Sequence, residues 1–114
     1  MTRVFIEVPL FTKRWKEIGL TDAELFELQD MLLKFPQVGP VIEGTGGVRK
    51  VRFPVENKGK SGSVRVLYAD FDKYEVVYFI TAFAKSEKEN LTQSEKAVVK
   101  KLVKTLLDEV RKRR

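Results

Sequence analysis

The residues of this sequence that could do chemistry are basic, and they gather around the glycine-rich stretch GTGGVRKVRFP at residues 44–54. Lys50 and Arg52 lie in the strand predicted to follow the glycines. Arg65 lies in the next predicted strand, and Lys85 follows the one after that. If these strands pair as hairpins, all four cations meet on one region of a sheet. An arginine guanidinium can donate two parallel hydrogen bonds to phosphate oxygens, and lysine supplies a compact charge or a proton. The cluster is therefore suited to binding a phosphodiester.

The strand after the glycines alternates its side chains between two faces. Val48, Lys50 and Arg52 share one face, while the other carries Arg49, Val51 and Phe53. Neighbouring cations on one face fit a polyanion, but charges on a solvated face also discourage pairing between sheet edges. Arg65 is expected on an exposed sheet face, where an acidic side chain across the strands is an alternative partner.

Two residue types are absent from the sequence, and their absence limits the reactions that the chain could catalyse. The 114 residues include no histidine and no cysteine, which excludes histidine-based nuclease chemistry, histidine metal sites, thiolate zinc sites and disulfides. The basic cluster offers chemistry that needs neither a metal nor a cofactor. Because arginine stays protonated, we expect Lys50, or after it Lys85, to serve as the base.

The positive charge of the chain is unevenly spread. The net charge is +6, and residues 43–68 carry six basic and two acidic side chains while residues 92–114 carry eight and three. Two basic segments favour a polyanionic partner, nucleic acid above all. In the second segment Lys96, Lys100 and Lys104 repeat at helical spacing, which suits a solvated helix face or an anionic partner.

The pattern of apolar residues and turn signals predicts a single α+β domain over residues 1–114. Capping boxes at Thr21 with Glu24 and at Thr92 with Glu95 mark two helix starts. The element order is β-α-α-β-β-β-α, and it predicts a four-stranded, mostly antiparallel sheet with two helices on one face and the third at an edge. The predicted strands are 4–8, 48–53, 64–71 and 74–84, and the predicted helices are 9–18, 21–35 and 92–111.

The sequence predicts neither a membrane span nor an export signal. No apolar run approaches the roughly 18 residues that cross a bilayer. The start, MTRVFIEVPLF, lacks the basic, apolar and cleavage regions of a signal peptide. We therefore expect a cytoplasmic protein without a membrane partner.

Several segments taken together resemble the RelE/ParE superfamily of bacterial toxins. They are GTGGVRKVRF, GKSGSVRVLYADF, FITAFAKSEKENLT and the basic final helix, in the family's order over essentially the whole chain. The resemblance is greatest to the HigB-type branch of type II toxin–antitoxin pairs. It implies a compact microbial-RNase-like RelE fold and an endoribonuclease that enters the ribosomal A site and cuts mRNA. It also implies neutralisation by a cognate antitoxin, for which a helix-turn-helix protein is expected.

The resemblance also implies roles for residues. Lys50 and Arg52 match the positions of the general base and of transition-state stabilisation. Arg65 matches the phosphate-binding arginine, and Lys85 matches the basic residue that ends the last strand. The implied reaction uses no metal. The mRNA 2′-OH attacks the adjacent phosphorus, giving a 2′,3′-cyclic phosphate or its 3′-phosphate and a 5′-OH.

The sequence departs from the family pattern at two places. Ser86 stands where RelE often has arginine, and residues 90–92 read NLT where relatives have tyrosine or histidine. The protonation of the leaving group therefore stays open between Lys85, Lys58, Lys60 and the ribosome itself. The side chains expected to contact RNA are Arg49, Lys58 and Lys60.

Two other functions are compatible with the same sequence. ParE-like toxins of the superfamily have the fold without the nuclease residues and poison DNA gyrase, and the basic pair Lys50 and Arg52 disfavours that reading. A non-catalytic module that binds RNA or the ribosome is compatible with the missing tyrosine and histidine.

Overall fold

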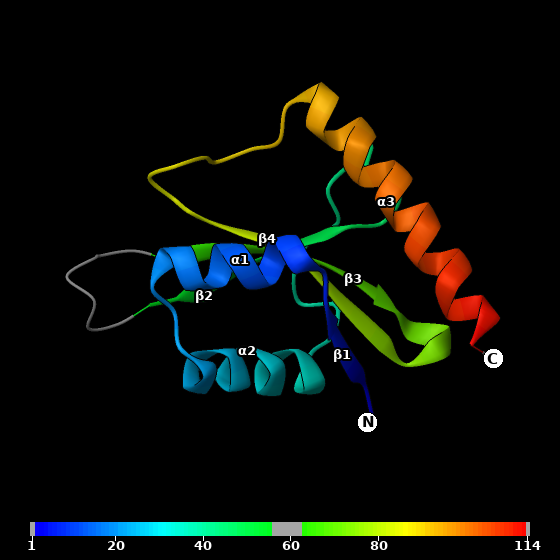
Figure 1. The fold of residues 1–114 in the computed structure, drawn as a ribbon, viewed down its shortest axis with the longest axis horizontal. Helices are drawn as coiled ribbons and strands as arrows, with labels where there is room; N and C mark the ends of the chain where they lie inside the picture. The colour runs from blue at the N-terminus through cyan, green and yellow to red at the C-terminus, as the bar shows by residue number, and fades with distance from the viewer. Residues whose placement is uncertain (1, 56–62, 114) are drawn as a thin grey trace.

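The chain folds into one mixed β-sheet with helices against both faces (Figure 1). The computed structural model describes residues 2–55 and 63–113. The strands are β1 (Val4–Glu7), β2 (Arg49–Pro54), β3 (Ser63–Phe71) and β4 (Val76–Ala84). The helices are α1 (Pro9–Ile18), α2 (Asp22–Lys34) and α3 (Gln93–Lys112), with a short 3-10 helix at Asp72–Tyr74.

The strands lie in the order β1-β4-β3-β2. β1 runs parallel to β4, whereas the β4–β3 and β3–β2 pairs are antiparallel. The predicted α+β class, element order and mostly antiparallel sheet are therefore confirmed. β3 lies between β4 and β2, and it is buried along most of its length, as expected for an inner strand covered on both faces.

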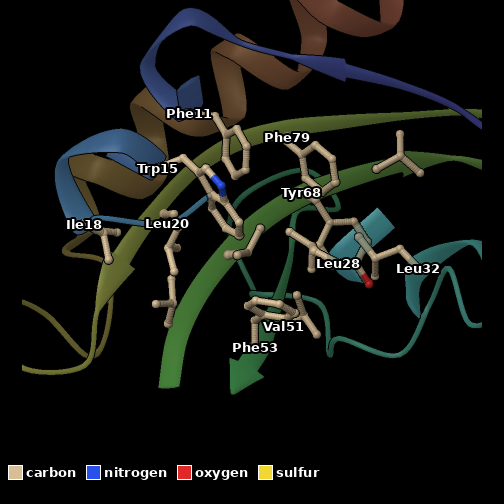
Figure 2. Close-up of a cluster of buried hydrophobic side chains, with 14 residues drawn as sticks. Phe11, Trp15, Ile18, Leu20, Leu28, Leu32, Val51, Phe53, Tyr68 and Phe79 are labelled. Carbon is tan, nitrogen blue, oxygen red and sulfur yellow. The ribbon is translucent and has the colours of Figure 1, made fainter. Parts of the chain in front are cut away.

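Helices α1 and α2 cover one face of the sheet and form the larger core with it (Figure 2). Phe11 of α1 stacks on Phe79 of β4 with ring centroids 4.8 Å apart, and on Trp15 at 5.3 Å. Stacked aromatic pairs add to the stabilisation from burial alone. Phe11 and Trp15 therefore lie in the core, whereas Phe26 and Phe35, the aromatic residues of the second predicted helix, are 71% and 64% exposed.

Helix α3 packs against the opposite face, so its predicted position at an edge is wrong (Figure 1). Val103 contacts a cluster that includes Leu67 and Ile80, and Leu106 and Val110 pack on Tyr78. The apolar stripe of α3 shows that one side is buried, but not which surface it meets. Within the described residues, no helix is both long and apolar enough to span a membrane.

Local sequence signals set the ends of the elements. Both capping boxes form, at Thr21 with Glu24 and at Thr92 with Glu95. The last strand begins at Val76 rather than at the predicted residue 74. The reason is that Asp72–Tyr74 forms a 3-10 turn, which delays the return of the chain into the sheet.

Candidate active site

The glycine-rich turn before β2 sets the start of the strand that carries Lys50 and Arg52. Gly44, Gly46 and Gly47 have φ angles of 84°, 77° and 111°, in the left-handed region that glycine adopts without strain. Thr45 is fully buried in this turn, where its hydroxyl donates to the Ile42 carbonyl at 2.6 Å and accepts from the Val48 N–H at 3.1 Å. The turn therefore delivers β2 in a fixed direction.

Beside this strand the surface is hollowed into an open pocket of about 500 Å³, here called the basic pocket. Its walls come from the loop after α2, from strands β2 and β3, and from residues 85–92, here called the 85–92 segment. The residues that line it are Val38, Gly39, Pro40, Lys50, Val51, Arg52, Arg65, Glu89 and Asn90. Three of the four cations predicted to converge thus share one cavity.

The two arginines of the basic pocket lie directly opposite each other on paired strands. Arg52 of β2 and Arg65 of β3 are register partners. Both donate to the hydroxyl of Ser63, Arg52 through Nε at 2.9 Å and Arg65 through Nη1 at 2.5 Å. Within the described residues, no carboxylate forms an ion pair with either guanidinium. Two cations held side by side on a neutral oxygen favour an anion between them.

The prediction that Arg65 is exposed is wrong, because only 9% of the residue's surface is exposed to solvent. β3 is flanked by β2 and β4, and Leu67, on the same face of the strand, is covered by the core beneath α3. The sequence indicated the alternation of β3 but not that its second face would be covered.

Lys50 joins the sheet to the 85–92 segment. Its Nζ donates to the backbone carbonyl of Glu89 at 3.2 Å and to Oδ1 of Asn90 at 3.3 Å. These contacts bring residues about forty positions apart in the chain to one side of the basic pocket. The Lys50 amine therefore has a defined place beside the two arginines.

The 85–92 segment is itself fastened at both ends. Near its start, the Glu87 carboxylate accepts from the Ala84 N–H at 2.8 Å and pairs with the Arg14 guanidinium of α1 at 2.5 Å. Near its end, Lys88 pairs with Glu95, whose carboxylate also closes the capping box of α3. The hydrogen bond from Lys88, with help from the Thr92 backbone N–H, lowers the pKa of Glu95.

The opposite wall of the basic pocket is held by a buried tyrosine. The Tyr68 hydroxyl donates to the Pro36 carbonyl at 2.9 Å and accepts from the Gly39 N–H at 3.1 Å. Burial raises the pKa of Tyr68. Gly39 has no room for a side chain, because an added Cβ would lie 2.8 Å from the Lys50 carbonyl oxygen. This wall therefore depends on glycine at position 39.

The remaining predicted site residues lie elsewhere. Lys85 is an exposed turn residue directly after β4 and does not line the basic pocket. Arg49 donates through Nη1 to the carbonyls of Gln37 and Gly39, at 3.1 and 2.8 Å, so it braces the loop after α2. The other two, Lys58 and Lys60, lie outside the described residues.

Three residues that contact the cations of the basic pocket were not predicted from the sequence: Ser63, Glu89 and Asn90. Ser63 could have been found, because it lies two positions before Arg65 and so on the same face of β3. Glu89 and Asn90 carried no such signal, since their approach to Lys50 depends on the path of the 85–92 segment. Among the described residues, no group of three potential ligands could hold a metal ion.

Comparisons with known proteins agree with this architecture. The family model of the RelE toxin of the RelE/RelB toxin–antitoxin system matches residues 2–113. A mutant of E. coli toxin RelE in the free state is 18% identical with a TM-score of 0.56, over 86% of this chain and 96% of that one. A chain of the intact E. coli RelBE toxin–antitoxin complex is 16% identical with a TM-score of 0.54, over 78% of this chain and all of that one. At such identities the structural likeness supports the fold alone.

Proposed function

The chain belongs to the RelE toxin family of toxin–antitoxin systems, and from that premise we propose that it is a ribosome-dependent endoribonuclease. In this proposal the protein enters the ribosomal A site in the cytoplasm, cuts mRNA there and so stops translation. In the same proposal a cognate helix-turn-helix antitoxin neutralises the protein, and the protein is a member of the HigB-type branch.

The observation that carries the proposal is the arrangement of Arg52 and Arg65 on the hydroxyl of Ser63. A phosphodiester has two non-bridging oxygens that carry negative charge, and in the transition state this charge grows. Guanidinium groups already held in place stabilise that growing charge without reorganising. The pocket that Arg52 and Arg65 line is open to solvent, so a phosphodiester can approach it from outside.

The reaction proposed for this site is an attack by the 2′-OH on the adjacent phosphorus. Lys50 takes the proton of the 2′-OH, and Arg52 and Arg65 stabilise the phosphorane oxygens. The bond from phosphorus to the 5′-oxygen then breaks, leaving a 2′,3′-cyclic phosphate or its 3′-phosphate and a 5′-OH. The leaving oxygen takes a proton from water, from the ribosome or from one of Lys85, Lys58 and Lys60.

A cell-free translation extract with a defined mRNA tests this function. We expect new 5′-OH ends only while ribosomes translate the message, and none when the scissile nucleotide is 2′-deoxy. Loss of plasmid supercoiling by gyrase with intact mRNA would instead identify a ParE-like poison. Ribosome binding without cleavage would identify a binding module.

The Lys50→Arg variant tests the assigned base, because arginine keeps the charge but cannot accept a proton near neutral pH. We expect ribosome binding to persist and cleavage to slow by roughly a hundredfold or more, the usual cost of losing a general base. A wild-type cleavage rate in Lys50→Arg would leave Lys50 with a role in charge alone, and Lys85→Arg would be measured next.

A further inference from the structure

The amine of Lys50 is held by two oxygen atoms of the 85–92 segment, and only one of them belongs to a side chain. The Glu89 contact uses the backbone carbonyl, whereas the Asn90 contact uses the side-chain amide oxygen, at 3.3 Å. The family pattern gave no role to residue 90 in this chain. Asn90 nevertheless lines the basic pocket with Lys50, Arg52 and Arg65.

Two such bonds fix more than the place of the nitrogen atom. An unrestrained lysine amine rotates about its Cε–Nζ bond, so its substituents sweep through all directions. When two of its three positions point at fixed oxygens, the third position is fixed as well. That third position holds either the lone pair that accepts a proton or the N–H that donates one.

The two oxygens can serve as anchors because the 85–92 segment is fixed independently of Lys50. Arg14 binds Glu87 and also donates to the Ala82 carbonyl of β4 at 3.1 Å. The capping box of α3 holds the other end, at Thr92 and Glu95. The anchors therefore belong to a frame built from α1, β4 and α3.

We propose that Asn90 is a positioning residue that aims the Lys50 amine for proton transfer in the cleavage reaction. The inference rests on the proposed nuclease function and adds a residue to it. Asn90 is exposed, and substitutions of exposed residues usually change stability little. Its role can therefore be separated from folding.

Single-turnover cleavage of mRNA on stalled ribosomes tests the proposal. Asn90→Leu keeps a similar size but removes the acceptor, and we expect the cleavage step to slow by about tenfold or more, since small misplacements of a reacting group are costly. Ribosome affinity should stay unchanged. Asn90→Gln keeps a neutral amide oxygen as acceptor and should cut faster than Asn90→Leu. Gln93→Leu, at an exposed amide on the first turn of α3, is the matched control and should cut at the wild-type rate.

A double-mutant cycle shows whether Asn90 acts through Lys50. In a Lys50→Met background, adding Asn90→Leu should slow cleavage no further. Full additivity, or a wild-type rate for Asn90→Leu alone, overturns the inference while leaving the nuclease function in place. Translated mRNA that stays intact with the wild-type protein overturns the nuclease function, and the inference with it.

Discussion

The two ends of strand β3 hold buried charges in opposite ways. Near its C-terminal end, Asp70 binds the Arg3 guanidinium at 2.9 Å, and their side chains are 1% and 4% exposed. Arg3 also pairs with Asp72 at 2.9 Å. At the N-terminal end, Arg65 is nearly as buried, but within the described residues its guanidinium donates to a serine hydroxyl that it shares with another arginine.

The difference separates a structural arginine from a binding one. Two carboxylates compensate Arg3, and the hydrogen bond that its guanidinium donates to Asp70 raises the pKa of Arg3 despite the opposing effect of burial. Such a cluster has no positive charge left for an anionic ligand. Its role is to link the start of β1 to the end of β3. Arg65 has a neutral partner within the described residues, so its charge remains available to a phosphate.

The largest expected effect is on catalysis, and it comes from Arg65 at the N-terminal end of β3. Arg65→Ala should slow mRNA cleavage by about a hundredfold to a thousandfold, as when one preorganised charge-stabilising group is removed elsewhere. Single-turnover cleavage measures this, with urea denaturation to confirm the fold. If Arg65→Ala unfolds the protein and the folded fraction still cuts normally, Arg65 is structural like Arg3 and the comparison fails.

At the compensated end the expected effect is on stability. Arg3→Ala leaves Asp70 buried without its partner, which should lower the free energy of unfolding by about 3 kcal/mol. Asp72 is 71% exposed, so the control Asp72→Ala should cost less than about 1 kcal/mol. Urea midpoints measure both. Cleavage per folded molecule should not change, and a loss of cleavage at an unchanged midpoint would contradict the structural role of Arg3.

A smaller effect is expected from the oxygen that holds the two arginines together. Ser63→Ala keeps every charge but removes the shared acceptor, so we expect cleavage to slow by about tenfold through lost orientation. Ribosome binding should keep the salt dependence of the wild type, because the number of phosphate contacts is the same. The exposed Ser94→Ala serves as the control. A changed salt slope in Ser63→Ala would mean that Ser63 orders contacts beyond this pair.

Much of the fold was predictable because its signals are local. Capping boxes, Pro9 and Gly19 mark helix ends through interactions within a few residues. The convergence of Lys50, Arg52 and Arg65 followed from alternation and hairpin pairing, which are also short-range rules.

The rest could not be predicted because it depends on contacts between distant residues. Helix α3 covers the sheet face opposite α1 and α2, and this depends on which surface its apolar stripe contacts. The approach of Asn90 to Lys50 depends on the Arg14–Glu87 pair, whose members are 73 positions apart. No pattern in the sequence predicts such a contact. Two of the corrections, the position of α3 and the burial of Arg65, concern this second face of the sheet.

The smallest effect concerns the partly exposed ion pair between Lys88 and Glu95, which joins the 85–92 segment to α3. The lowered pKa of Glu95 means that its charged form is favoured by folding. Its contribution is therefore present above the ordinary value of 4.5 and is lost as the pH falls through the lowered pKa of the folded state. Glu95→Gln should lower the urea midpoint slightly at about pH 7, and the difference from the wild type should shrink below about pH 4.5. Because solvent screens a partly exposed pair, the shift of the urea midpoint should be smaller than that of Arg3→Ala.

Asp108→Asn is the control for a general charge effect, because Asp108 is an exposed acid of the same helix and lies 3.9 Å from Arg111. An equal and parallel response in both variants would show that the Lys88–Glu95 contact has no special part in holding the 85–92 segment. A response confined to Glu95→Gln, together with slower cleavage, would show that this partly exposed pair helps to position Asn90.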